Sequence, residues 1–249
     1  MNFFQKLSYS QKFHNNITIH HMNTHMTDSS LWPIEWKKVH YKHYPRFKSI
    51  QLPKTKLKKN IYLKHVLISR KSERLFTNRS ITLNQISMLL KYSCGNKEST
   101  INELGDFTRF YPSAGGRYPL EIYLATSNIS NLNPGLYHYN VKKHELEILL
   151  EKNTIYNISS FCGQEWIKQS NAILIISSIF ERNKIKYGER GYRYACFEAG
   201  HIAQNIYLIA TGQKLKCCAI GGFLDNKINN LIDIDKYQEA VIYMIAIGT

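Results

Sequence analysis

The longest strongly apolar run in the sequence extends from Ala172 to Phe180 and includes two serines. It is far shorter than the roughly 20 apolar residues that a membrane helix needs, and it has the length of a buried β-strand. A second apolar run, from Ala240 to Ile247, predicts another buried strand. These runs predict a protein built on a buried sheet, with no membrane association.

Three further segments read as strands. Leu120–Thr126 alternates between apolar and polar residues in strand fashion. Leu136–Tyr139 and Glu145–Leu150 flank a polar turn, which predicts a hairpin. The sheet is therefore expected to contain at least one antiparallel pair.

Two other segments have helical periodicity. Thr82 and Gln85 form a T-x-x-Q capping box before regularly spaced apolar residues, so a helix is predicted from about 82 to 94. From Tyr194 to Ala210, apolar residues gather on one face with small residues beside them, which predicts a long, closely packed central helix. The mixed order of helices and strands predicts an α+β fold.

Composition indicates the cellular compartment and the division of the chain into domains. The chain has 43% hydrophobic residues, enough for a substantial core, and five cysteines without a C-x-x-C pair, which favours a reducing cytoplasm. Residues 1–65 are rich in His, Lys and Asn and are interrupted by three prolines. We expect them to form an N-terminal extension that packs on the core or contacts a peptide or partner, before a main domain over residues 66–249.

Charge and histidine content raise two binding hypotheses. The formal net charge of +15 would suit an anionic partner, but the basic residues are dispersed, so no nucleic-acid binding is predicted. Four histidines near the N-terminus invite a metal hypothesis: His14, His20, His21 and His25. No cysteine or carboxylate joins them at ligand spacing, and no metal site is predicted.

The first segment that can carry chemistry is R-K-S-E-R, where Arg70 and Arg74 flank Ser72. Two guanidinium groups four residues apart can converge on one phosphate or on the carbonyl edge of a flavin. A solvated basic face is the alternative interpretation.

The second segment is a proline-bounded run of tiny residues that leads into a strand: Pro112, Ser113, Ala114, Gly115 and Gly116. Missing side chains let main-chain amides approach a flat ring such as a flavin, whereas the alternative is a tight turn before the strand. The third segment places Lys186 beside Tyr187, two groups that could move a proton. In an extended segment these neighbours would point in opposite directions.

Taken in order, five motifs resemble those of the SagB/ThcOx-type dehydrogenases of the nitroreductase superfamily, over about residues 65 to 249. They are R-x-S-x-R, P-S-A-G-G-R-Y-P-L-E, G-L-Y-H-Y, K-Y-x-x-R-G-Y-R-Y with E-A-G-H-x-x-Q-N, and I-G-G-F. The resemblance implies a nitroreductase-type α+β fold, a homodimer with FMN at its interface, and a cyclodehydratase partner. Thiazoline or oxazoline rings in a ribosomally made precursor peptide of the bacteriocin or toxin type would be oxidised to thiazoles or oxazoles.

The resemblance also implies residue roles. The FMN phosphate and polar edge would be held by Arg70, Ser72 and Arg74. The run that begins at Pro112 and continues through Ser113, Ala114, Gly115 and Gly116 would lie along the isoalloxazine. Gly221 and Gly222 would direct a main-chain amide toward flavin N5.

Lys186 and Tyr187 match the catalytic pair of that family, and either could take the substrate proton. Two alternatives remain at this level. One is a general nitroreductase or quinone reductase that uses a nicotinamide donor, and the other is a non-catalytic scaffold of a peptide-modifying complex.

Overall fold

The computed structural model describes residues 8–19, 28–57, 62–102 and 105–249. The α-helices are α1 (Tyr9–Asn16), α2 (Ile34–Lys37), α3 (Leu63–Ser69), α4 (Leu83–Cys94), α5 (Ile155–Cys162), α6 (Glu181–Tyr187), α7 (Arg190–Gly212) and α8 (Asp225–Leu231). Short 3₁₀ helices are η2 (Ser29–Leu31), η3 (Ala114–Gly116) and η4 (Glu165–Gln169). The strands are β1 (Ser49–Gln51), β2 (Ile81–Thr82), β3 (Asn96–Ile101), β4 (Phe107–Arg109), β5 (Leu120–Thr126), β6 (Ile129–Ser130), β7 (Gly135–Asn140), β8 (Glu145–Leu150), β9 (Ala172–Ile179), β10 (Lys216–Ile220) and β11 (Glu239–Gly248).

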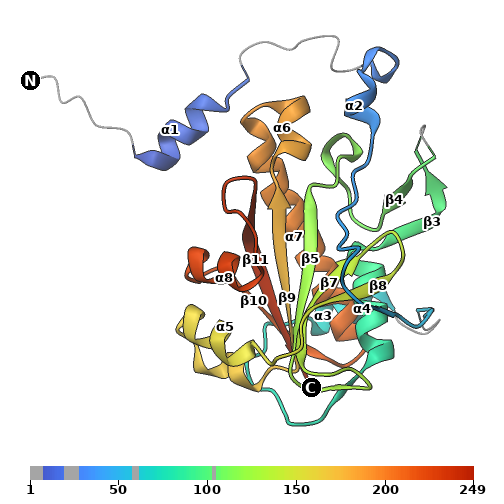
Figure 1. The fold of residues 1–249 in the computed structure, drawn as a ribbon, viewed down its shortest axis with the longest axis vertical. Helices are drawn as coiled ribbons and strands as arrows, with labels where there is room; N and C mark the ends of the chain where they lie inside the picture. The colour runs from blue at the N-terminus through green and yellow to red at the C-terminus, as the bar shows by residue number, and fades with distance from the viewer. Residues whose placement is uncertain (1–7, 20–27, 58–61, 103–104) are drawn as a thin grey trace, which may run out of the picture.

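Seven strands form the central sheet in the order β1-β8-β7-β5-β9-β11-β10 (Figure 1). Every neighbouring pair in it is antiparallel. Strands β5 and β9 pair along the whole of β5, from Leu120 opposite Ser178 to Thr126 opposite Ala172. The predicted hairpin is confirmed as β7 and β8.

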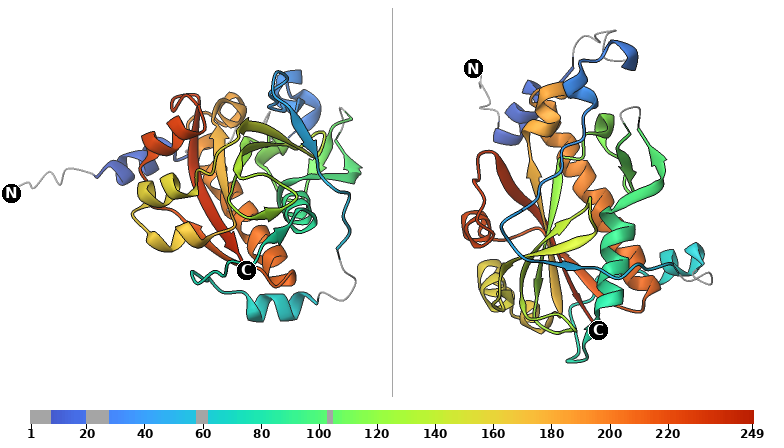
Figure 2. Two further views of the ribbon diagram at one scale, coloured as in Figure 1. Left: turned by 60° about the horizontal axis from the view of Figure 1, so that its bottom comes forward. Right: turned by 45° about the vertical axis from the view of Figure 1, so that its right-hand side comes forward.

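Helices cover both faces of this sheet. Alternate residues of β5 enter two different cores, because successive side chains of a strand point to opposite faces. Ile122 packs with the buried residues of α4 and α7, which lie side by side against one face (Figure 2). Tyr123 packs with α5, η4 and α8 on the other face.

The predicted α+β fold is confirmed. Helix α4 begins at the predicted capping box, in which Thr82 and Gln85 each bond the other's main chain. The predicted central helix is α7, which starts four residues earlier than the apolar pattern did. Among the described helices, none is both long and apolar enough to cross a membrane.

Candidate active site

Lys186 and Tyr187 meet at one point of the structure. Both belong to the last turn of helix α6 and not to an extended segment. A Cβ atom added at Gly115 would lie 2.9 Å from Lys186 Nζ and 2.5 Å from Tyr187 Oη. Gly115 also has a φ of +58°, so its place in the loop requires glycine for two independent reasons.

The Lys186 amine is enclosed by aromatic rings. Lys186 is only 5% exposed, and its Nζ has no hydrogen-bond partner among the described residues. Nζ lies 2.8 Å from the ring centroid of Trp32 and 5.6 Å from that of Trp36. Burial, and then the charge of Arg117, lower the pKa of Lys186 to about 8. A usable fraction of the amine is therefore neutral near neutral pH, and able to accept a proton.

The pKa of Tyr187 is shifted in the opposite direction. Burial, followed by the neighbouring Tyr194, raises the pKa of Tyr187 to about 12, although Arg117 opposes the shift. Its hydroxyl consequently keeps its proton and can donate a hydrogen bond. Lys186 is therefore the candidate base, and Tyr187 is the candidate hydrogen-bond donor.

The tiny-residue run forms the wall opposite this pair. Ser113 Oγ accepts a hydrogen bond of 2.8 Å from the Tyr118 N–H, and the Ala114 N–H donates to Glu198 Oε1 at 3.1 Å. Gly116 follows Gly115 in the left-handed region, and no atom lies within 4 Å of the place of its missing Cβ. Main-chain atoms of this loop are therefore accessible to a flat ligand. We call Ser113–Gly116 with Lys186, Tyr187 and Glu198 the loop half-site.

Hydrogen bonds from Arg117 hold part of the N-terminal segment next to the loop half-site. Arg117 is almost fully buried, and its Nη1 donates to the carbonyl oxygens of Glu35 at 2.7 Å and Lys38 at 3.0 Å. These bonds position the segment that carries Trp32 and Trp36. Neither tryptophan was singled out from the sequence, because nothing local links them to a lysine some 150 residues away.

The R-K-S-E-R segment lies along the edge strand β10, where the Glu73 N–H donates to the Cys217 carbonyl at 2.9 Å. Ser72 Oγ is 2.8 Å from the hydroxyl of Tyr207, which also accepts a hydrogen bond from the Ala219 N–H at 2.9 Å. The Arg70 guanidinium stacks over the Tyr207 ring at 5.3 Å. We call Arg70 and Ser72, with Gly221 and Gly222, the arginine half-site.

The two arginines of this segment do not converge within one chain. Arg74 lies 5.8 Å from the ring centroid of Trp166 in η4, which packs with the core on the other face of the sheet from Tyr207. Beyond β10, Gly221 and Gly222 leave their main chain open, since the nearest atom to either missing Cβ is 4.0 Å away, on Tyr243.

Helix α7 separates the two half-sites. Glu198 belongs to the loop half-site and Tyr207 contacts the arginine half-site, and the nine helical steps from one residue to the other correspond to roughly 13 Å. The surface of α7 between these positions is exposed at Gly200, His201 and Gln204, and Phe197 beside them is 55% exposed. One chain therefore presents the two half-sites at different places along α7, with an exposed helix face between them.

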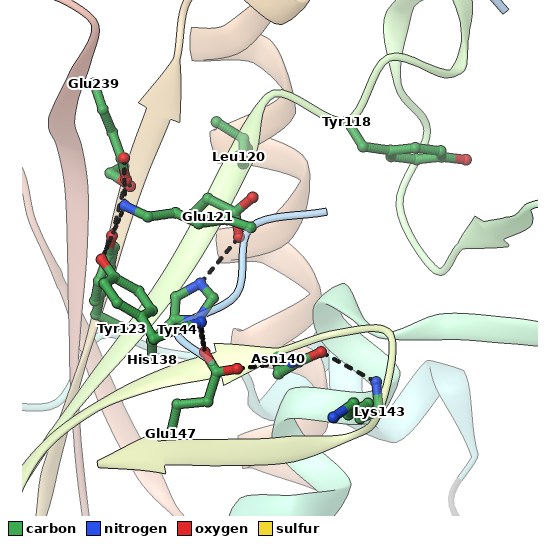
Figure 3. Close-up of polar contacts among 12 residues, drawn as sticks. Tyr44, Tyr118, Leu120, Glu121, Tyr123, His138, Asn140, Lys143, Glu147 and Glu239 are labelled. Atoms are coloured by element: carbon green, nitrogen blue, oxygen red, sulfur yellow. Dashed lines mark hydrogen bonds and ion pairs between the residues drawn. The ribbon is translucent and has the colours of Figure 1, made fainter. Parts of the chain in front are cut away.

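A chain of buried charges fixes α6 to the sheet, and Figure 3 shows the part of it around His138. His138 lies between two carboxylates, 2.8 Å from Glu147 and 3.1 Å from Glu121. Glu121 pairs in turn at 2.6 Å with Arg182, which lies one turn of α6 before Lys186. Burial alone would lower the pKa of His138, but the bonds to Glu121 and Glu147 raise it. Burial would likewise raise the pKa of Glu121, yet Arg182 and His138 hold it at about 2.

Residues 42–44 of the N-terminal segment join the same network. Lys42 Nζ pairs with Glu239 at 2.6 Å and donates to the Tyr123 hydroxyl at 2.6 Å. The Tyr44 N–H donates to Glu147 at 3.1 Å (Figure 3).

The described residues contain no group of three or more potential metal ligands, and His20, His21 and His25 lie outside them.

A model of the nitroreductase family matches residues 67–249, and the chain belongs to that family. It is similar to a nitroreductase-like protein of Methanocaldococcus jannaschii, with 35% identity over 189 residues, 76% of this chain and 91% of that protein. It is also 33% identical over 150 residues to the microcin B17-processing protein of Escherichia coli, covering 58% of this chain and 55% of that protein.

A solved nitroreductase-like structure from Anabaena variabilis aligns with a TM-score of 0.77 and 25% identity, over 96% of this chain and 46% of that one. The chain thus spans about half of the microcin-processing protein and of the Anabaena chain. The match to the family model includes all three chemistry-bearing segments identified in the sequence.

Proposed function

We propose that the protein is an FMN-dependent dehydrogenase that oxidises thiazoline or oxazoline rings to thiazoles or oxazoles in a ribosomally made peptide. One observation carries the proposal: the buried Lys186 amine, which has no hydrogen-bond partner among the described residues, meets the Tyr187 hydroxyl at Gly115. A base and a donor at one point suit removal of a proton from carbon. The similarity to a microcin B17-processing protein supports a peptide as the substrate.

The cofactor is FMN, on which the nitroreductase family depends. The residues present fit it. Arg70 and Ser72 can hold its phosphate, while the open main chain at Gly221 and Gly222 and in Ser113–Gly116 can lie along its ring. The buried Lys186 amine, to which no described residue offers a hydrogen bond, is a further polar group that a bound ring and substrate would satisfy.

We further propose that a complete site forms between two copies of the chain. The arginine half-site of one copy and the loop half-site of its partner would then face each other across the exposed side of α7, where Phe197 is 55% exposed. A twofold dimer builds two identical sites in this way, because each copy supplies both halves.

The chain's own residues would act on the proton. Bound FMN would supply the hydride acceptor for the ring carbon next to the one that carries the peptide carbonyl. Neutral Lys186 takes the proton from the carbonyl-bearing carbon, and the electron pair left there becomes the new ring double bond. Tyr187 donates a hydrogen bond at the same point and orients the base. Trp32 and Trp36 exclude water from the amine.

The proposed substrate implies a partner enzyme. An azoline must first be made from a Cys, Ser or Thr side chain, so a cyclodehydratase would act before this protein on the same precursor peptide. The N-terminal extension over residues 1–65 would contribute to peptide binding, since Trp32 and Trp36 already lie against Lys186. The main domain over residues 66–249 would hold FMN.

The test is mass spectrometry of an azoline-containing precursor peptide treated with the FMN-loaded protein. We expect each converted ring to lose two hydrogens, with the mass loss confined to peptides that the cyclodehydratase has already modified. A peptide of unchanged mass, together with rapid bleaching of the flavin by a nicotinamide alone, would instead identify a general nitroreductase. A protein that stays colourless with excess FMN would identify a scaffold.

A further inference from the structure

Arg117 directly follows the Ser113–Gly116 loop and carries an enclosed positive charge, on a residue that is only 2% exposed. Its Nε donates to the Arg182 carbonyl oxygen in the first turn of α6, at 2.8 Å. Its Nη1 donates to the carbonyl oxygens of Glu35, in α2, and of Lys38, directly after it. Main-chain oxygens from two elements therefore satisfy this buried charge, as a buried cation requires.

The bond from Arg117 to α6 is one half of a reciprocal tie. Arg182 Nη1 donates in the other direction, to the Tyr118 carbonyl oxygen at 3.2 Å. Arg182 is in turn held by its ion pair with Glu121 at 2.6 Å. The start of β5 and the first turn of α6 are thus bonded to each other in both directions. Lys186 lies one helical turn beyond Arg182, so the same bonds position its amine.

The bonds from Arg117 to the N-terminal segment hold the cover of that amine. We call residues 28–39 the tryptophan strap, because they carry Trp32 and Trp36. Helix α2 of the strap packs against η3, and the Trp32 ring centroid lies 2.8 Å from Lys186 Nζ. The amine comes from α6 and its aromatic cover from the strap. Arg117 bonds both of them.

The charge of Arg117 acts on the same amine. Burial, and then this charge, lower the pKa of Lys186, while Tyr187 beside it keeps its proton. The groups that act on Arg117 in return are Tyr187, Arg182 and Glu35. A guanidinium stays protonated in proteins, so its repulsion of a second positive charge persists at every pH of interest.

We propose that Arg117 is a positioning residue for the catalytic base: one guanidinium holds α6 and the tryptophan strap together, and so keeps the Lys186 amine covered and neutral. The inference deepens the proposed function and rests on it for the role of Lys186 as the base. Arg117 itself has no contact with the reacting atoms in this scheme. It acts through the position and the charge state of Lys186.

Arg117→Gln tests the inference, because it removes both the charge and the fork that joins the two elements. We expect the curve of kcat against pH to move to higher pH by about one pH unit, so that kcat at pH 7 falls by about 5- to 10-fold and is regained at higher pH. Arg117→Lys keeps the charge and should restore most of the curve. Arg79→Gln, at an exposed arginine of the main domain, should leave the curve unchanged.

Two readouts on the FMN-loaded protein without peptide do not depend on azole formation. One is the NMR titration of the Lys186 side chain in protein with isotope-labelled lysine, assigned with Lys186→Ala. Its midpoint should rise in Arg117→Gln. The other is tryptic cleavage after Lys38, whose carbonyl oxygen Arg117 holds. Cleavage there should accelerate several-fold in Arg117→Gln and also in Arg117→Lys, because a lysine lacks the rigid fork.

The outcomes separate this inference from the proposed function. If the wild type forms no azole but both readouts change as expected, the proposed function fails while the positioning of Lys186 by Arg117 stands. If Arg117→Gln does not fold, cleavage after Lys38 in Arg117→Lys decides. A folded Arg117→Gln protein in which Lys186 titrates as in the wild type, or wild-type cleavage after Lys38 in both variants, would overturn the inference.

Discussion

Lys186→Ala is expected to lower the rate of azole formation by about 10²- to 10⁴-fold, the range that general-base catalysis contributes. Tyr187→Phe should lower it less, because it removes an orienting hydrogen bond and leaves the base. In the wild type the rate should rise as pH passes through about 8, since only the neutral amine accepts a proton and burial lowers the Lys186 pKa to that value. Initial rates at several pH values, with FMN content tracked, measure this.

Lys184→Ala is the matched control for that experiment. Lys184 lies in the same helix, two residues before Lys186, but its amine is partly exposed and pairs with Glu181 and Glu189. Its loss should leave the rate unchanged. If Lys186→Ala and Tyr187→Phe both keep FMN and full turnover, the assignment of the catalytic pair is wrong.

Glu121→Gln is expected to cost about 3 to 5 kcal/mol of unfolding free energy, because it leaves the buried Arg182 guanidinium without its partner. The His138 ring would lose one of its two carboxylates as well. Urea unfolding followed by circular dichroism measures the change. Glu145→Gln, on strand β8 of the same sheet and outside this network, should cost less than about 0.5 kcal/mol.

The pH dependence of stability gives a second check on the same pair. The Glu121 pKa is lowered from 4.5 to about 2 in the folded protein. Its contribution is therefore complete above about pH 4.5 and is lost as the pH falls toward 2. The wild type should lose more stability than Glu121→Gln across that interval. Parallel losses in the two proteins would show that the Glu121–Arg182 pair is not what fixes α6.

Sequence reasoning predicted elements whose signals are local. The helix after Thr82 has its capping box within four residues, and β9 has an uninterrupted apolar run. Helix α6 was missed because it is short and begins after Phe180, which makes no side-chain capping bond. Its position depends on Arg182 pairing with Glu121, a contact across 61 positions of the chain that no local pattern encodes.

The same distinction between local and long-range signals applies to the candidate site. Residue types and spacing marked Gly115, Lys186 and Tyr187, but not that a helix and a left-handed glycine would bring them together. The spacing of Arg70 and Arg74 allows their guanidinium groups to converge on one phosphate. Spacing along the chain does not determine which side of β10 each side chain takes, and in the structure they stack on Tyr207 and Trp166 on opposite faces of the sheet.

We propose that each redox site combines the arginine half-site of one chain with the loop half-site of another. Its most direct test is the activity of a mixed dimer, purified through two different tags, in which one copy carries Arg70→Glu and the other Lys186→Ala. Each variant alone should be inactive. The mixed dimer should recover about half of the wild-type activity, because one of its two sites receives both intact halves. A mixed dimer no more active than its parents would contradict the account.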